Sequence, residues 1–191
     1  MPRAGLDRAT VVAAGARLAD EVGAAGLGMA LLAERLGVKT PSLYKHVGGQ
    51  ADLVHAIAVQ ASVELGNAVR EAIQGRAGTD ALDATARAVR AYVREHPGRY
   101  AVGNAVRPAG PDDPLAVANA RLLASFSAVL AGYRLDPRQE VHALRTLRSA
   151  LHGFAVLEAE GGFRYDTDVE ASFAWLVALL DQGLRAGAEP S

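Results

Sequence analysis

Apolar residues recur every three or four positions along most of the chain, which is the pattern of helices with one buried face. In one such segment, Leu53, Ile57, Ala61 and Leu65 fall on the same side of a predicted helix. No segment alternates apolar and polar residues for long enough to indicate a β-strand. The pattern therefore predicts an all-α fold of about nine helices.

Capping residues locate the expected helix ends. Asp7 is predicted to cap the first helix, and the third is expected to begin with Thr40 as its cap and Pro41 at its first position. Thr167, with Glu170 three residues later, is predicted to cap the last helix. The expected helices cover about 8–22, 29–36, 41–47, 50–75, 80–95, 98–106, 114–132, 137–159 and 167–185.

The glycine-containing segment 75–79 is the clearest candidate for a domain boundary. Before it we expect a three-helix domain over residues 1–50, followed by a connecting helix over 51–75. After it we expect a larger helical domain over residues 76–191.

Composition narrows the classes of protein to which the chain can belong. Half of the residues are hydrophobic but only 5% are aromatic, so Ala, Val and Leu must fill the interior. The absence of cysteine excludes disulfides, thiolate metal sites and cysteine nucleophiles. We find no apolar run of about 18 residues and no signal-peptide core near the N-terminus, so we expect a cytoplasmic protein that does not bind a membrane.

The segment GVKTPSLYKH, residues 37–46, contains the only two lysines of the chain, Lys39 and Lys45. The net charge is −1, so any binding of nucleic acid must depend on a local patch. The short turn GVK forces a steep crossing of the second and third helices, and their apolar seam is predicted to consist of Leu32, Leu36, Val38 and Leu43. This seam leaves hydroxyl, cationic and aromatic side chains outside, and these are the types that contact phosphates and base edges.

Residues 7–58 resemble the N-terminal domain of the tetracycline-repressor (TetR) family of bacterial transcription regulators. The matching pieces are LGMALLAERLGV and PSLYKHVGGQADLV, in which the family pattern LYxHF is replaced by LYKHV. The resemblance implies a helix-turn-helix over about 28–47, whose second helix enters the major groove of DNA. It further implies base contacts from Lys39, Thr40, Pro41 and Ser42. Phosphate contacts are implied for Tyr44, Lys45 and His46.

The chain departs from the family at several positions that contact phosphates. Gly28 replaces the Thr or Ser that often caps the second helix, and Gly49 and Gln50 replace the usual Ser-Lys at the start of the fourth. At these three positions we expect DNA contacts to fall partly to backbone amides at the helix N-termini. Operator affinity is therefore expected to depend strongly on Lys39 and Lys45.

Two later segments, EHPGRYAV (95–102) and LRSALHGFAVLEAEGGF (147–163), resemble the "W/L-H-G" subgroup of TetR-like C-terminal domains. This resemblance implies that residues 76–191 bind an effector and form a dimer. The residues expected to line an effector pocket are Tyr92, Tyr100, Phe126, Arg148, His152 and Trp175. The alternatives are a solvated or ion-paired arginine and a histidine packed in the core.

The family resemblance also implies a homodimer in which the last two helices pair with their twofold mates. The interface residues expected from helical spacing are Leu144, Leu147, Leu151, Phe154, Phe173, Leu176 and Leu180. The alternative is that both apolar faces are buried in the core of the protomer. Dimerisation is favoured independently, because a single helix-turn-helix reads too few base pairs to be specific.

No motif in the chain indicates catalysis, a metal or a cofactor. Ser149 and His152 are three residues apart on one predicted helix, but no acidic residue is placed to orient the imidazole. Of the five histidines, only His142 and His152 share a helix, and they are nearly three turns apart. We therefore expect a protein that is not an enzyme and uses no cofactor.

The function predicted from these observations is a ligand-responsive transcriptional repressor. It would bind a palindromic operator in double-stranded DNA as a homodimer and respond to an unknown small-molecule effector. One alternative is a helical small-molecule-binding or enzymatic protein that has lost DNA binding, which Gly28, Ala30 and Gln50 favour. Another is a constitutive repressor without an effector.

Overall fold

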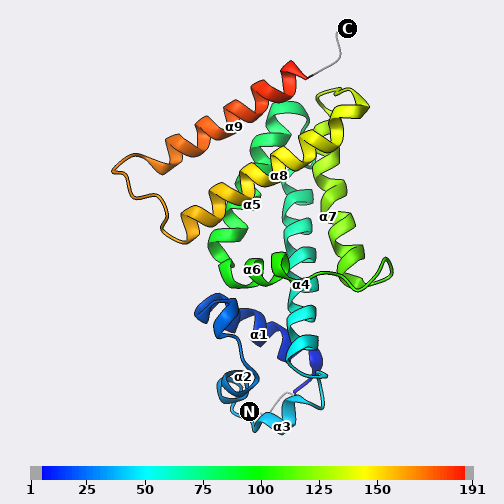
Figure 1. Ribbon diagram of the computed structural model, residues 1–191, viewed down its shortest axis with the longest axis vertical. Helices are drawn as coiled ribbons and strands as arrows, with labels where there is room; N and C mark the ends of the chain where they lie inside the picture. The colour runs from blue at the N-terminus through cyan, green and yellow to red at the C-terminus, as the bar shows by residue number, and fades with distance from the viewer. Residues whose placement is uncertain (1–5, 188–191) are drawn as a thin grey trace. The chain divides into compact units, whose positions relative to one another are not determined.

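The computed structural model describes residues 6–187, and within that range it contains nine α-helices, one short 3-10 helix and no β-strand. This confirms the predicted all-α fold (Figure 1). In chain order the elements are α1 (Arg8–Val22), η1 (Ala24–Gly26), α2 (Met29–Arg35), α3 (Thr40–Leu43), α4 (Gln50–Ala72), α5 (Gly78–Glu95), α6 (Pro97–Ala105), α7 (Pro114–Ala131), α8 (Pro137–Ala159) and α9 (Val169–Ala186).

The cap of the first helix is the predicted one, whereas the cap of the last lies one residue later than predicted. A carboxylate oxygen of Asp7 accepts a hydrogen bond from the Thr10 amide at 2.7 Å. At α9 the cap is Asp168 rather than Thr167, and its carboxylate accepts from the amide of Glu170 at 2.9 Å. Both residue types can cap a helix, so the sequence alone did not distinguish these neighbours.

Helix α3 also begins one residue earlier than predicted. Its N-cap is Lys39, with no side-chain hydrogen bond, and Thr40 is already helical. The backbone carbonyl of Lys39 accepts from the amide of Ser42 at 2.8 Å. Pro41 occupies the second helical position, which is tolerated because amides of the first turn have no partner within the helix.

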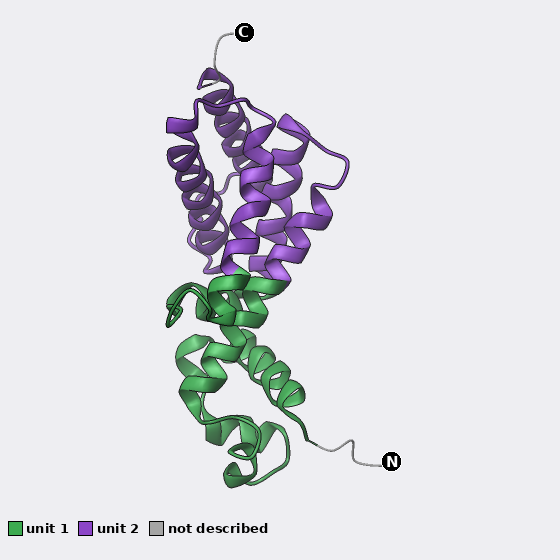
Figure 2. Cartoon of the chain, turned by 90° about the vertical axis from the view of Figure 1, so that its right-hand side faces the viewer, with its two compact units in different colours: residues 1–63, 96–118 green, residues 64–95, 119–191 purple. Residues whose placement is uncertain are grey.

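The chain divides into two compact units, shown in different colours in Figure 2. Unit 1 comprises residues 1–63 and 96–118, and unit 2 comprises residues 64–95 and 119–191. This division differs from the predicted domains, because α4 is shared between the units and α6 belongs to unit 1.

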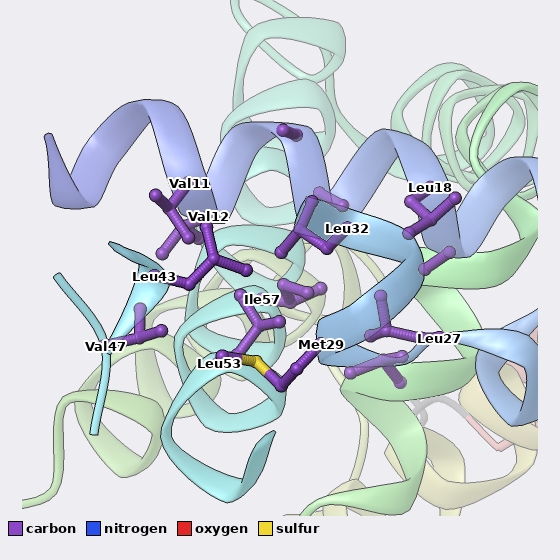
Figure 3. Packing of buried hydrophobic residues seen from close by; sticks show 14 of the residues in the cluster. Val11, Val12, Leu18, Leu27, Met29, Leu32, Leu43, Val47, Leu53 and Ile57 are labelled. Atoms are coloured by element: carbon purple, nitrogen blue, oxygen red, sulfur yellow. The ribbon is translucent and has the colours of Figure 1, made fainter. Parts of the chain in front are cut away.

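Unit 1 has one apolar core, to which α1, α2, α3 and α4 all contribute. The predicted seam of the helix-turn-helix forms part of it, with Leu36 and Val38 packed against its edge. Its largest fully buried side chains include Val11, Leu18, Leu32, Leu43, Leu53 and Ile57 (Figure 3). The short helix α3 therefore depends on tertiary packing rather than on its own length.

Helix α6 joins unit 1 by packing directly against α1. A Cβ atom at Gly98 would lie 1.8 Å from the carbonyl oxygen of Ala19, so the two backbones approach as closely as glycine allows. Next to this contact, the carboxylate of Asp20 accepts from the backbone amide and the Nε of Arg99, each at 2.8 Å. These contacts fix α6 on the helix that supports the helix-turn-helix.

In unit 2, a buried arginine connects α5 to α8 and α9. Arg90 donates to both carboxylate oxygens of Glu158, at 2.6 and 2.8 Å, and to Glu170 at 2.5 Å. Its guanidinium carbon lies 4.4 Å from the ring centroid of Phe173, a favourable position for a cation–π interaction. The charge of Arg90 is thus compensated inside the unit, as a buried ion requires.

Helix α7 is apolar and long enough to cross a membrane by length and composition alone. Its apolar residues do not form one uninterrupted run, because Asn119, Arg121 and two serines lie among them. Phe126 and Leu130 of α7 are buried inside the protein. We therefore interpret α7 as a core helix of a globular fold.

Candidate DNA-binding site

The turn between α2 and α3 has the backbone geometry of a glycine-terminated helix. Gly37 adopts a positive φ of 67°, and its amide donates to the carbonyl of Glu34 at 3.0 Å. The amide of Val38 donates to the carbonyl of Ala33, also at 3.0 Å. This pair of bonds is the Schellman motif, which ends α2 and redirects the chain at once into α3.

The segment from residue 39 to residue 46 combines one buried anchor with seven side chains that reach solvent. Leu43 is fully buried, whereas Tyr44 is 56% exposed. Lys39 and Lys45 are exposed and form no ion pair with any residue in the range 6–187. The remaining predicted contact residues of the segment are the exposed Pro41 and the half-buried Thr40, Ser42 and His46. The structure therefore gathers these seven predicted residues on one segment that solvent can reach.

Of the three other predicted contact residues, two are glycines at helix N-termini. Gly28 is the N-cap of α2 and makes no side-chain cap, and Gly49 precedes α4 with a φ of 130°. The ring of Tyr44 lies 3.9 Å from the position that a Cβ of Gly49 would take. Neither glycine has a side chain that could cap the amides of the first helical turn, and such amides bind anions.

The third, Gln50, is engaged within the protein. Its side-chain nitrogen donates to the backbone carbonyl of Leu27 at 2.8 Å. The bond ties the start of α4 to the chain just before α2, so this side chain stabilises the motif, while Gln50 as a whole remains exposed. A local pattern could not indicate this contact, since the two residues are 23 positions apart.

An ion pair that the sequence did not indicate lies beside the segment of residues 39–46, which we call the recognition segment. Arg8 of α1 donates to the two carboxylate oxygens of Asp52 at 2.7 and 2.8 Å, and to the carbonyl of His46 at 3.1 Å. The same carboxylate accepts from the amide of Gly48 at 2.8 Å. The hydrogen bond from Arg8, and then that from Gly48, hold the pKa of Asp52 well below its usual range. The carboxylate is therefore ionised at neutral pH.

The six residues predicted for the effector pocket are divided between the two units and differ in exposure. Tyr100 belongs to unit 1 and the other five belong to unit 2. Tyr92, Tyr100 and Phe126 are buried, whereas Trp175 is 68% exposed. Arg148 is also exposed, and His152 is half-buried.

Two cavities in unit 2 are lined by other residues. An open groove of about 940 Å³ lies between α5 and α9, with Ala84, Ala88 and Ala178 in its wall. A smaller cavity of about 430 Å³ lies between the N-terminal half of α8 and the C-terminal half of α9. None of the six predicted residues lines either of them.

Four of the seven predicted interface residues, Leu147, Leu151, Phe173 and Leu180, are at most 9% exposed and are therefore buried inside the protomer. The other three, Leu144, Phe154 and Leu176, are half-buried. Helical spacing correctly identified an apolar stripe, but most of that stripe faces the core. The large apolar side chains exposed on α8 and α9 are instead Val141, Leu157, Trp175 and Leu179.

Comparisons with known proteins agree with this architecture. Residues 11–57 match the model for bacterial regulatory proteins of the tetR family, and residues 82–180 match the tetracyclin repressor-like C-terminal domain. The chain is 37% identical to the uncharacterized HTH-type transcriptional regulator Rv0681 of Mycobacterium tuberculosis, over 94% of this chain and 82% of that protein. It is 30% identical to the regulator YobS of Bacillus subtilis, over 96% and 95% of the respective chains.

Solved structures show the same fold. SCO7222, a TetR from Streptomyces coelicolor, superposes with a TM-score of 0.74 at 19% identity, over 97% of this chain and 100% of that one. TetR from Acinetobacter baumannii AYE superposes with a TM-score of 0.70 at 22% identity, over 95% and 98%. The fold and the exposed recognition segment define a helix-turn-helix transcriptional regulator. Together with the matching models and relatives, they show that the chain belongs to the TetR family.

Proposed function

We propose that this regulator is a ligand-responsive repressor that binds a palindromic operator as a homodimer. The observation that carries the proposal is the segment from Lys39 to His46, which Leu43 anchors in the core while its cationic, hydroxyl and aromatic side chains reach solvent. DNA-operator binding, dimerisation and response to small molecules are typical of the family. The protein would act in the cytoplasm and catalyse no reaction.

On the operator, we assign base contacts to the N-terminal part of the recognition segment and phosphate contacts to its C-terminal part. Lys39, Thr40, Pro41 and Ser42 would face base edges in the major groove. Tyr44, Lys45 and His46 would contact phosphates, together with the amides that follow Gly28 and Gly49.

The dimer would form through the apolar surface that α8 and α9 leave exposed. Val141, Leu157, Trp175 and Leu179 leave large apolar surface on these two helices, and exposed apolar surface of this kind favours a protein partner. A twofold dimer would present two recognition helices to the inverted half-sites of the operator.

The effector would bind in the C-terminal part of the chain, which we assign to the "W/L-H-G" subgroup on the sequence Leu151-His152-Gly153. The buried Tyr92 and Phe126 remain the best candidates for an aromatic pocket wall. An effector that prefers the arrangement unable to bind DNA would weaken operator binding, and the operator would weaken effector binding by the same factor.

The test of DNA binding begins with selection of a duplex from a randomised library by the wild-type protein. Fluorescence anisotropy with this selected duplex is expected to show an affinity that falls steeply as salt rises, because bound phosphates release counterions. Failure to select any duplex, or an affinity independent of salt, would contradict the proposal and favour a helical protein that has lost DNA binding.

A further inference from the structure

The chain between the recognition helix and α4 is held at both ends by a single side chain from α1. Arg8 donates through Nη1 to the carbonyl of His46 and to Asp52, and through Nη2 to the second carboxylate oxygen of Asp52. Because Asp52 also accepts from the amide of Gly48, three points of the turn over residues 46–52 meet at one ion pair.

The ion pair lies where the negative charge of Asp52 would otherwise affect DNA binding. Asp52 lies in the first turn of α4, and its side chain is 36% exposed. The N-terminus of α4 is also where backbone amides are expected to meet DNA phosphates. An uncompensated carboxylate within the screening distance of about 8 Å would repel those phosphates. The guanidinium of Arg8, which stays protonated in proteins, cancels that charge.

We propose that Arg8 is a positioning residue for operator binding. Through its bonds to Asp52 and to the carbonyl of His46, it holds the turn that follows the recognition helix and removes a negative charge from the phosphate-facing end of α4. The inference rests on the proposed DNA-binding function and adds to it a residue outside the helix-turn-helix motif.

A second ion pair of unit 1 serves as a matched control. Arg35 of α2 lies 2.5 Å from a carboxylate oxygen of Glu21, and its side chain is 51% exposed, the same fraction as that of Arg8. Replacing either arginine removes one positive charge from unit 1. An exposed ion pair contributes little to folding stability, so a large difference in DNA affinity between the two variants would come from the location of Arg8.

The experiment compares the anisotropy titrations of wild type, R8Q, R8K, D52N, R8Q/D52N and R35Q with the duplex that the wild type selects. R8Q is expected to weaken binding about tenfold or more, whereas R35Q weakens it by less than about threefold. R8K retains the cation and should lose less affinity than R8Q. The double variant R8Q/D52N should recover the part of the loss that comes from the uncompensated carboxylate, while the bonds from Arg8 that hold the turn remain absent. Circular dichroism melting shows whether each variant is folded at the titration temperature.

Three results of these titrations would contradict the proposed role of Arg8. Equal losses for R8Q and R35Q would overturn it, as would a double variant that binds no better than R8Q or an R8K variant as weak as R8Q. These outcomes leave the DNA-binding function intact, because the wild type still binds its duplex. If the wild type selects no duplex, both the proposed function and the role of Arg8 are wrong.

Discussion

At the scale of single residues, the recognition segment combines a buried leucine with two lysines that have no acidic partner in the described part of the chain. The other 18 basic residues are arginines, and many of those in the structure are ion-paired. With a net charge of −1, the protein has no global attraction for DNA. Lys39 and Lys45 therefore supply a large share of the local positive potential at the recognition helix.

We predict that the double variant Lys39→Ala/Lys45→Ala loses specific binding to the selected duplex while its unfolding free energy changes by less than about 0.5 kcal/mol. Both side chains are exposed, so their loss leaves no cavity. The matched control is Arg138→Ala/Arg164→Ala, which removes the same charge from exposed positions of unit 2. Similar affinity losses for the two double variants would show that the lysines act only through net charge.

Local sequence patterns predicted which side chains of this segment are exposed, because caps, turns and apolar seams depend on neighbours within about four positions. The same patterns cannot predict contacts between residues that are distant in sequence. Arg8 and Asp52 are 44 positions apart, and Gln50 reaches a carbonyl 23 positions earlier. The second contact shows that Gln50, which was predicted to contact DNA, also stabilises the motif.

At the scale of elements, the structure adds a contact that no periodicity indicates, the packing of α6 on α1. The contact is made by backbone atoms around Gly98 and by the ion pair of Asp20 with Arg99. It explains why α6 belongs to unit 1 although the predicted boundary placed it in the C-terminal domain.

We predict that Gly98→Ala destabilises the protein by more than about 1 kcal/mol, because the new methyl group would collide with the backbone of Ala19. The control is Gly153→Ala within α8, where nothing lies within 4 Å of the added Cβ. This change is expected to stabilise the helix by about 0.5–1 kcal/mol. Urea unfolding measures both, and equal effects in the two variants would contradict the close approach.

The cluster of Arg90 with Glu158 and Glu170 predicts how stability depends on pH. In the folded protein, the hydrogen bond from Arg90 holds the pKa of Glu158 below 4.5, the ordinary value of a glutamate side chain. A lowered folded-state pKa contributes stability that is complete above the unfolded value and is lost as pH falls through the folded one. We therefore expect the melting temperature to fall with pH below about 4.5, and to fall less steeply in Glu158→Gln. The exposed control Glu71→Gln should follow the wild type, and a Glu158→Gln profile parallel to the wild type would contradict this role.

At the scale of the whole molecule, helical spacing predicted which helices carry apolar stripes but not which stripe faces the core. Helix α9 has small or apolar residues on several sides, so its period alone does not distinguish the face buried by Phe173 from the face that exposes Trp175. Packing partners from α5 and α8 decide this, and they are remote in sequence. We therefore propose an interface at the exposed apolar side chains of α8 and α9 rather than at the buried leucines.

Trp175 is the single tryptophan of the chain and reports directly on this interface. Because it is 68% exposed in the protomer, dimerisation through α9 should shift its fluorescence to shorter wavelength. We predict that Leu179→Arg, which places a charge on the same face, gives a monomer with red-shifted emission. Val117→Arg, at a similarly exposed position of α7, should behave as the wild type. Identical spectra for wild type and Leu179→Arg would contradict an interface at this face.

The stoichiometry of the complex with the selected duplex, measured by sedimentation or native mass spectrometry, tests whether the protein binds its operator as a homodimer. We expect two chains on a duplex whose sequence contains two inverted half-sites, with centres separated by a whole number of helical turns of about 10.5 base pairs. One chain per duplex, or a selected sequence without an inverted repeat, would contradict it.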